Sequence, residues 1–244
     1  MCELYILFWY FVMMQRIVVL SGAGISAESG VSTFRDNDGL WENHKVEDVA
    51  TPRAWEVNKE LVLDFYNQRR KQLLDVKPNK GHQALVKLEE QFNVEIITQN
   101  VDDLHERAGS SNVLHLHGEL KKVRSTIDPS LVYKMEGWEL KMGDNCPRGE
   151  QLRPHIVWFG EEVPNILLAA ELLRSADCLI IVGTSLNVYP AAGLIHELKP
   201  NSPIYLVDPN EVNTGIAEGI RIIQAKASEG LTRLVNQLLE KNKK

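Results

Sequence analysis

The 244-residue chain contains little cysteine, and its three cysteines, Cys2, Cys146 and Cys178, are far apart. Three cysteines are too few for a disulfide framework or a four-cysteine zinc site, so a reducing compartment is the default expectation. We therefore expect a cytoplasmic protein. Cys178 lies inside an apolar run and is expected to be a small buried hydrophobic residue.

The chain also lacks an excess of positive charge. It has 27 Lys and Arg against 33 Asp and Glu, which gives a formal net charge of −6 at pH 7. Such a chain has no basic field to attract a phosphodiester backbone. Nucleic acid is therefore not an expected partner.

A hydrophobic run long enough to span a bilayer is missing as well. The apolar run Leu4–Met14 has eleven residues, no basic residue before it and no small-residue cleavage site after it. It is too short for a membrane helix and does not match a signal peptide, so we expect no membrane partner. Met14 comes directly before the first expected strand. We expect that translation starts there and that residues 1–13 are a non-native extension.

What the chain does have is a globular composition, 44% hydrophobic and 25% charged, with a glycine turn after its first β-branched run. Arg16–Leu20 is followed by Ser21-Gly22-Ala23-Gly24, and Ala27 stands three positions after Gly24. Glycines after a strand let the backbone turn sharply and approach a phosphate, and a following helix start favours an anion. An ordinary strand-to-helix connection remains an equal interpretation of this stretch alone.

Strand and helix patterns alternate along the rest of the chain. Further strands are expected at Val94–Thr98, Val113–His117, His155–Phe159, Cys178–Val182 and Pro203–Val207. Helices are expected from Thr51-Pro52, over Glu60–Leu74 and Gly81–Gln91, up to Ala108, and over Asn165–Ser175, Pro190–Leu198 and Ser228–Leu239. The alternation predicts an α/β fold, a doubly wound Rossmann-like parallel sheet with a second, smaller domain built from insertions. We place the larger domain at 14–41, 76–118 and 153–244, and the smaller one at 42–75 and 119–152.

Small or polar residues follow the expected strands where each one ends. They are Gln99 to Asp103, His117, Gly183 to Ser185, and Asp208. Open α/β sheets bind ligands at this edge. His117 at a strand end is as consistent with a catalytic histidine as with a structural one.

The expected helix over Glu60–Leu74 carries Val62, Tyr66, Arg69 and Leu73 at helical spacing. Arg69 therefore lies on a face that otherwise points inward. Its stem could run along the core while its guanidinium reaches water, or the guanidinium could have a buried partner.

Six ordered motifs carry a resemblance to a known family. They are Gly22–Ser26 (G-A-G-I-S), Phe34–Trp41 (F-R-D-N-D-G-L-W), Thr98–Gly109 (T-Q-N-V-D-D-L-H-E-R-A-G), His117-Gly118, Arg153–Glu161 (R-P-H-I-V-W-F-G-E) and Gly183–Ala191 (G-T-S-L-N-V-Y-P-A). The chain resembles the sirtuins from about Arg16 to its terminal helix. The resemblance implies an NAD-dependent protein lysine deacylase that releases nicotinamide and transfers the acyl group from lysine to ADP-ribose.

The resemblance also implies which residues bind NAD. Gly22, Ala23, Gly24 and Ser26 would hold the pyrophosphate, with Arg35 nearby and Phe34 shielding the ribose face. Gln99, Asn100, Val101 and Asp102 would line the nicotinamide and ribose pocket, with Val101 where isoleucine is common. Gly183, Thr184, Ser185, Asp208, Pro209, Asn210 and Ala227 would form the adenosine side, with Asp208 where asparagine is usual. His117 would be the general base, and Asn100 the second catalytic residue.

Tyr66 and Arg69 resemble the residues of the sirtuin branch that removes succinyl and malonyl groups, and the surrounding A-T-P-R-A-W and F-Y-N-Q-R-R agree. A guanidinium makes paired charge-assisted hydrogen bonds to a carboxylate, and a phenol adds one more. We therefore expect these two residues to bind an acidic acyl group, with deacetylation as an additional activity.

The chain departs from the family at its metal site. Typical sirtuins hold zinc with two C-x-x-C pairs, but this chain has Ser125 and Asp128 for the first pair, and Cys146 and Gly149 for the second. One thiolate cannot make a closed tetrahedral site. We expect no metal, and a small domain held by Trp138, Leu140 and Val132 instead.

Three other functions remain open at this point. An NAD hydrolase or a mono-ADP-ribosyltransferase would use the same pocket, although neither gives a reason for a carboxylate clamp. A non-catalytic NAD-sensing module is disfavoured by the presence of His117 and Asn100. The protein substrates and the oligomeric state are left open.

Overall fold

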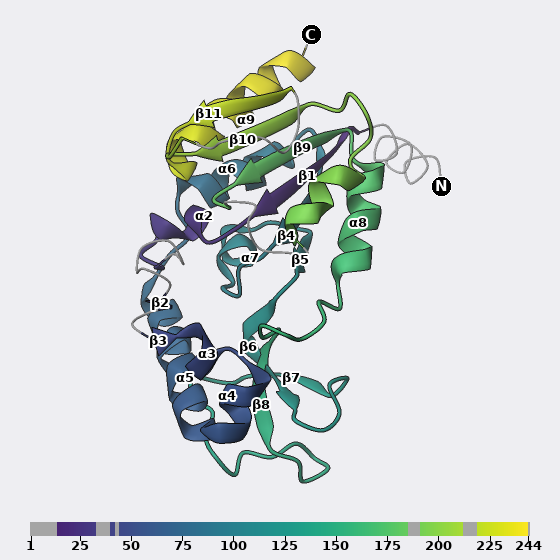
Figure 1. Ribbon diagram of the computed structural model, residues 1–244. Coiled ribbons are helices and arrows are strands. Elements are labelled where there is room, and N and C mark those ends of the chain that lie inside the picture. The colour runs from purple at the N-terminus through teal and green to yellow at the C-terminus, as the bar shows by residue number, and fades with distance from the viewer. Residues whose placement is uncertain (1–13, 33–39, 42–43, 185–190, 212–218, 244) are drawn as a thin grey trace, which may run out of the picture.

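Six parallel strands form the larger sheet of the computed structural model, which describes residues 14–32, 40–41, 44–184, 191–211 and 219–243 (Figure 1). The strands lie in the order β11 (Ile220–Gln224), β10 (Ile204–Asp208), β9 (Cys178–Val182), β1 (Arg16–Ser21), β4 (Asn93–Thr98) and β5 (Val113–His115). Every neighbouring pair is parallel. The chain builds one half of the sheet outward from β1 and later returns to build the other, so the order of strands reverses beside β1. Ligands of open α/β sheets bind at such a reversal.

Helices cover both faces of this sheet. α6 (Lys80–Leu88) and α9 (Ala227–Asn242) lie on one face, and α8 (Ile166–Ser175) and the 3-10 helix η1 (Ala191–Glu197) lie on the other (Figure 1). Because side chains alternate along a strand, Ile17 and Val19 pack under α6 and α9, whereas Val18 and Leu20 pack under α8. The predicted doubly wound parallel sheet is confirmed.

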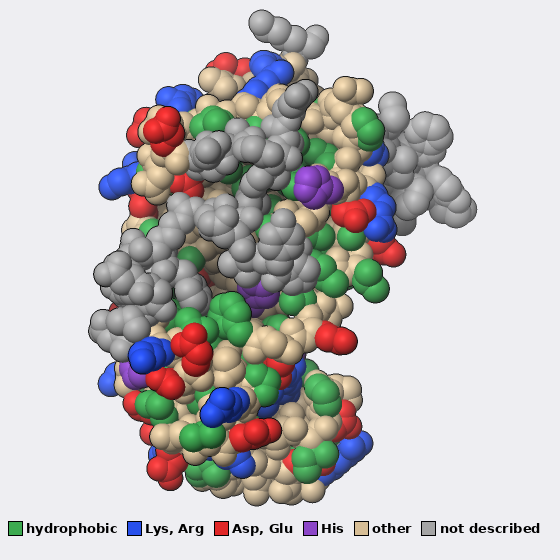
Figure 2. Space-filling view, viewed as in Figure 1, with side chains coloured by type: hydrophobic (Ala, Val, Ile, Leu, Met, Phe, Trp, Pro, Cys, Tyr) green, Lys and Arg blue, Asp and Glu red, His purple; other side chains and the backbone are tan. Residues whose placement is uncertain are grey.

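A separate antiparallel sheet belongs to a smaller part of the fold. Its strands lie in the order β7 (Val132–Lys134), β6 (Gly118–Ser125) and β8 (Leu152–Ile156). Beside it lie α3 (Val46–Val49), α4 (Pro52–Val57) and α5 (Lys59–Asp75), together with the hairpin of β2 (Leu40–Trp41) and β3 (His44–Lys45). These helices pack against the antiparallel sheet around a separate core, which includes Phe65, Tyr66 and Trp158. The outline of the molecule is indented between the two parts (Figure 2).

The short helices α2 (Gly24–Ala27) and α7 (Leu104–Ala108) follow β1 and β4. Gly109 ends α7 with φ +109°, as its position in the sequence predicted. Thr51 caps α4 by accepting a hydrogen bond from the Ala54 amide at 3.0 Å, as predicted from Thr51-Pro52. Among the described residues, no helix is long and apolar enough to cross a membrane. Residues 1–13 lie outside the described residues, so the proposed start at Met14 stays a prediction.

Four details of the predicted elements are wrong. The strand expected over His155–Phe159 is β8, and it pairs with β6 in the antiparallel sheet and not in the parallel one. The strand expected to run to His117 ends at His115, because the chain crosses between the sheets at Gly118 (φ +84°). The described part of the helix expected over Pro190–Leu198 is 3-10 in form. Strands β6 and β11 were not predicted, since charged residues interrupt their apolar pattern.

Candidate active site

Two glycine turns meet at the carboxyl ends of β1 and β9. The Gly22 amide donates to the Val182 carbonyl at 3.0 Å, and the Gly24 amide donates to the Gly183 carbonyl at 2.9 Å. A Cβ on Gly22 would lie 2.7 Å from the Gly183 oxygen, and a Cβ on Gly183 would lie 2.3 Å from the Ile25 nitrogen. These glycines therefore allow backbone to pack directly on backbone. Phe34, Arg35 and Ser185 lie outside the described residues.

Next to these turns, three predicted site residues form one buried polar cluster. Ser26 Oγ donates to Asp102 Oδ2 at 2.9 Å and accepts from Asn100 Nδ2 at 3.2 Å. The Leu104 amide donates to Asp102 Oδ1 at 3.1 Å. Burial raises the pKa of Asp102, an effect that the bonds from Leu104 and Ser26 oppose. Ser26 lies on α2, directly after β1, and Asn100 and Asp102 directly follow β4, so the pairing of these two parallel strands brings the cluster together.

Gln99 connects this cluster to the ends of β9 and β5. Its Nε2 donates to Thr184 Oγ1 at 3.0 Å, and its carbonyl lies 3.1 Å from His117 Nδ1. Because a carbonyl can only accept, His117 carries a proton on Nδ1 and presents the lone pair of its neutral form at Nε2. Burial lowers the pKa of His117 below its usual value, partly offset by the bond to Gln99. A neutral imidazole at this position can accept a proton near pH 7.

The residues expected on the adenosine side lie at the end of β10 and the start of α9. Asp208 is buried, and its Oδ1 accepts from the Asn210 backbone amide at 2.9 Å and from Asn210 Nδ2 at 3.2 Å. Pro209 between them is exposed. Ala227 is buried where the start of α9 meets the start of α6, with its backbone 3.3 Å from a Cβ built on Gly81. Val101 packs instead toward the core of the smaller part, and its carbonyl accepts from the Leu120 amide at 2.8 Å.

Tyr66 is fully buried on α5, and its phenol oxygen accepts a hydrogen bond from Trp158 Nε1 at 3.0 Å. Desolvation by burial raises the pKa of Tyr66, so the phenol keeps its proton. The amide of Val157, one residue before Trp158, donates to the His117 carbonyl at 2.9 Å. Two consecutive residues thus connect Tyr66 to His117.

Arg69 follows Tyr66 by one turn of α5, with its guanidinium carbon 5.1 Å from the centre of the Phe65 ring. The residue is half-buried, whereas the neighbouring Arg70 is fully buried and donates to the Trp138 carbonyl at 2.8 Å. The buried face of α5 is therefore wider than the predicted stripe. Arg69 lies at its border and Arg70 within it.

Trp158 is held by an ion pair that the sequence reasoning missed. Arg153 donates to both carboxylate oxygens of Glu161 at 2.7 and 3.1 Å, and its guanidinium carbon lies 3.2 Å from the centre of the Trp158 ring. Glu161 also accepts from the Trp158 amide at 2.8 Å. All three residues are in the Arg153–Glu161 motif, but only the fold shows that the motif supports Tyr66.

The residues at the expected metal positions do not fit zinc. Ser125 Oγ accepts from the amides of Ile127 and Asp128 at 3.0 Å each and donates to the Glu150 carboxylate. Cys146 is buried with its Sγ 3.7 Å from the same carboxylate. This donor set has one thiol, and no group of three His, Cys, Asp or Glu that could hold a metal occurs among the described residues. The absence of zinc stays a prediction.

The prediction that Trp138, Leu140 and Val132 form the hydrophobic core around the expected metal positions is partly wrong. Leu140 is buried and Trp138 is half-buried, but Val132 is 37% exposed. Val132 and Tyr133 point to opposite faces of β7, and Tyr133 packs against the core in its place. The predicted role of Val132 is therefore taken by its neighbour.

Comparisons with known proteins show which family the chain resembles. The family model described as the Sir2 family matches residues 22–190. The NAD-dependent protein deacylase of Bacteroides thetaiotaomicron is 54% identical over 231 residues, which cover 93% of this chain and 99% of that protein. The NAD-dependent protein deacylase of Helicobacter pylori is 54% identical over 227 residues, with coverage of 93% and 99%. A solved complex of a Sir2 homolog with NAD has a TM-score of 0.82 and 38% identity, covering 98% of this chain and 94% of that one.

Proposed function

This chain belongs to the Sir2 family, and we propose that within this family it removes acidic acyl groups, succinyl and malonyl, from lysine side chains. The broader activity is that of its relatives: the chain is an NAD-dependent protein-lysine deacylase that acts on acylated proteins or peptides. Its fold and its site residues fit NAD, because buried hydrogen-bonding groups from β1 and β4 lie beside the glycine turns at the reversal of strand order.

In this proposal the glycine turns and Ser26 hold the NAD pyrophosphate, and Asn100 and Asp102 line the nicotinamide and ribose pocket. Asp208 and Asn210 hold the adenosine side. When bound, NAD supplies a ribose carbon from which nicotinamide leaves. His117 acts as general base, with Nε2 taking a proton from a ribose hydroxyl, since its Nδ1 is engaged by the Gln99 carbonyl.

One observation carries the acyl preference. The buried Tyr66 oxygen accepts from Trp158 and therefore keeps its own hydrogen to donate. Arg69, one turn away, adds a guanidinium that can donate to a carboxylate in pairs. A succinyl or malonyl group ends in a carboxylate, whereas an acetyl group has none. Tyr66 and Arg69 therefore distinguish acidic acyl groups from acetyl.

Mass spectrometry of one peptide carrying acetyl-, malonyl- or succinyl-lysine, incubated with and without NAD, tests this proposal. We expect NAD-dependent loss of malonyl and succinyl to be faster than loss of acetyl. Loss of acetyl alone would contradict the acyl preference and leave the deacylase activity intact. Consumption of NAD without loss of any acyl group would favour an NAD hydrolase or ADP-ribosyltransferase.

We also propose that the protein works in the cytoplasm. The support is its cysteine content, since Cys146 and Cys178 are both buried free thiols. Burial raises the pKa of Cys178 to about 12, which makes it an inert residue. Fractionation that recovers the native protein outside the cytoplasm would contradict this proposal.

A further inference from the structure

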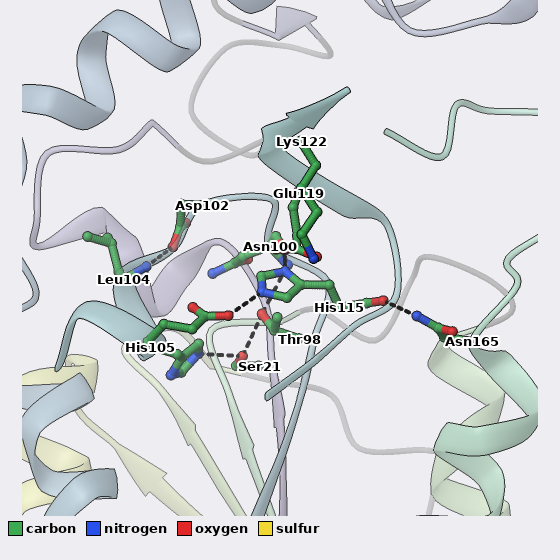
Figure 3. Close-up of polar contacts among 11 residues, drawn as sticks. Ser21, Thr98, Asn100, Asp102, Leu104, His105, His115, Glu119, Lys122 and Asn165 are labelled. Atoms are coloured by element: carbon green, nitrogen blue, oxygen red, sulfur yellow. Dashed lines mark hydrogen bonds and ion pairs between the residues drawn. The ribbon is translucent and has the colours of Figure 1, made fainter. Parts of the chain in front are cut away.

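A second histidine, besides His117, contacts the segment that carries Asn100 and Asp102. His115 at the end of β5 is buried, with Nδ1 2.9 Å from the Asn100 carbonyl oxygen and Nε2 2.7 Å from Glu106 Oε1 on α7 (Figure 3). The proposed function assigns no role to either His115 or Glu106.

Both partners of His115 are hydrogen-bond acceptors. A carbonyl oxygen and a carboxylate have no hydrogen to donate, so both ring nitrogens must carry one. His115 is therefore an imidazolium ion, paired with the Glu106 carboxylate. The electrostatics agree: burial alone would lower the pKa of His115, but the hydrogen bond and charge of Glu106, with the Asn100 carbonyl, raise it above its usual value.

The groups around this pair favour the same charge state. Glu119 on β6 faces His115 and further raises its pKa, and the buried Asp102 also interacts with its charge. His105 on α7 is neutral, because burial holds its pKa well below the usual range. Burial would raise the pKa of Glu106, but the bond and charge of His115 and the charge of Lys122 lower it.

The Asn100 carbonyl that His115 holds belongs to a segment fixed at several other points. The Asn100 amide donates to Thr98 Oγ1 at 3.0 Å, which in turn accepts from Ser21 Oγ at 2.9 Å. The Asn100 side chain donates to Ser26. The segment thus receives a charged donor at the Asn100 carbonyl, while the side chains of Asn100 and Asp102 contact Ser26.

Loss of one proton from His115 would break this arrangement in a defined way. The carboxylate retains the hydrogen on Nε2 more strongly than the neutral carbonyl retains the one on Nδ1. The lone pair of Nδ1 would then face the lone pairs of the Asn100 oxygen at 2.9 Å. The carbonyl would have to move, and with it the segment from Gln99 to Asp102.

We propose that His115 is a positioning residue: as an imidazolium bound to Glu106, it holds the Asn100 carbonyl and keeps the segment 99–102 in the conformation that binds NAD. This inference rests on the proposed NAD-binding role of Asn100 and Asp102. It predicts that NAD binding weakens as pH rises through the pKa of His115, which lies above the usual histidine value. Protonation of His117 would slow the reaction only at lower pH, because the pKa of His117 is below its usual value.

Two measurements test the inference without relying on turnover. The first is an NMR titration of the histidine rings, and the second is the NAD dissociation constant measured by calorimetry from pH 6 to pH 9. In the wild type, NAD binding should weaken about tenfold, the cost of one lost buried hydrogen bond, with the same midpoint as the His115 titration. Glu106→Gln removes the negative charge, so the His115 titration should move to lower pH and NAD binding should no longer weaken at the wild-type midpoint. Glu90→Gln, at an exposed glutamate in the turn after α6, is the matched control and should move neither.

The outcomes separate the two proposals. NAD binding whose pH dependence does not follow the His115 titration would overturn the positioning role and leave the proposed function intact. A wild type that binds no NAD at any pH would overturn both. If Glu106→Gln fails to fold, the wild type still tests the positioning role, because the midpoint of NAD binding must agree with the midpoint of the His115 titration.

Discussion

At the scale of single residues, Gly183 shows most directly what the site demands of the backbone. Its φ of +64° is open to alanine at a modest cost, but a Cβ there would lie 2.3 Å from the Ile25 nitrogen. That nitrogen belongs to the turn after β1 and cannot move without displacing Ser26. The requirement for glycine therefore comes mainly from the contact between two turns.

We predict that Gly183→Ala lowers the free energy of unfolding by more than about 3 kcal/mol, since it adds a steric clash to the cost of the left-handed conformation. Gly143→Ala is the control, because Gly143 also has a positive φ (+92°) but nothing within 4 Å of the added Cβ. It should cost only about 1 kcal/mol. Urea unfolding of both variants measures the difference, and equal costs would contradict the steric argument.

The sequence predicted the identity of several site residues better than their surroundings. Polar residues after each strand marked Asn100, Asp102 and His117, because parallel strands bring their carboxyl ends to one edge. The partner of Tyr66 could not be found this way, since Trp158 is 92 positions further along the chain. The helical spacing placed Arg69 on the inward face of α5, whereas the structure buries Arg70 and leaves Arg69 half-buried. Which arginine is buried depends on Asn67 and the Trp138 carbonyl, which Arg70 contacts.

At the scale of elements, the start of α6 makes the stability of the fold depend on pH. His82 is fully buried at the third position of the helix, where its Nδ1 accepts from the Asn79 amide at 3.3 Å and completes a capping box. Burial lowers the pKa of His82 to about 4. The ring of His105, also buried and neutral, lies 5.0 Å away.

Acid should therefore unfold the protein through this pair of histidines. Between pH 6.5 and pH 4 the unfolded chain binds a proton at position 82 that the folded protein does not, so stability falls as pH falls. His82 alone should contribute about 3 kcal/mol to this fall. Denaturant unfolding across this pH range measures it.

The matched variants are His82→Gln and His196→Gln. Glutamine at position 82 can keep the capping box but cannot titrate, so the pH dependence should become shallower. His196 is exposed on η1, and its replacement should leave the pH dependence unchanged. A His82→Gln protein as sensitive to acid as the wild type would contradict this assignment.

The module between β6 and β8 is expected to be stable without metal. The Ser125 side chain is buried, and its hydroxyl hydrogen-bonds two backbone amides and the Glu150 carboxylate. Ser125→Ala should cost about 1–3 kcal/mol, whereas Ser130→Ala, at an exposed serine of the same turn, should cost little. A chelator should change neither the melting temperature nor the activity. One zinc ion per chain by elemental analysis would contradict this account.

The strongly apolar strands of the parallel sheet were predicted well, and the strands of the smaller part were not. β9 matches its prediction residue for residue because it is apolar throughout, as a central parallel strand must be. β8 was assigned to the wrong sheet, since five residues contain no information about their partner strand. That partner is decided at Gly118, where a Cβ would lie 2.1 Å from the His155 oxygen.

At the scale of the whole molecule, the two parts of the fold contribute different halves of the proposed chemistry. The parallel sheet supplies the polar cluster of Ser26, Asn100 and Asp102 for NAD, and α5 of the smaller part supplies Tyr66 and Arg69. Trp158 and Val157 connect the two through Tyr66 and the His117 carbonyl. This connection places the proposed recognition of the acyl group and the proposed general base on one continuous set of contacts.

The measurement that tests the central claim most directly is the ratio of kcat/KM for succinyl-lysine over acetyl-lysine peptides, in the wild type and in Arg69→Met. We predict a ratio above one in the wild type and a fall of about 10- to 100-fold in the variant, from loss of charge-assisted hydrogen bonds to the substrate. Arg53→Met, the same change at an exposed arginine on α4, is the control and should keep the wild-type ratio. An equal loss of both activities in Arg69→Met, with the ratio unchanged, would contradict the account.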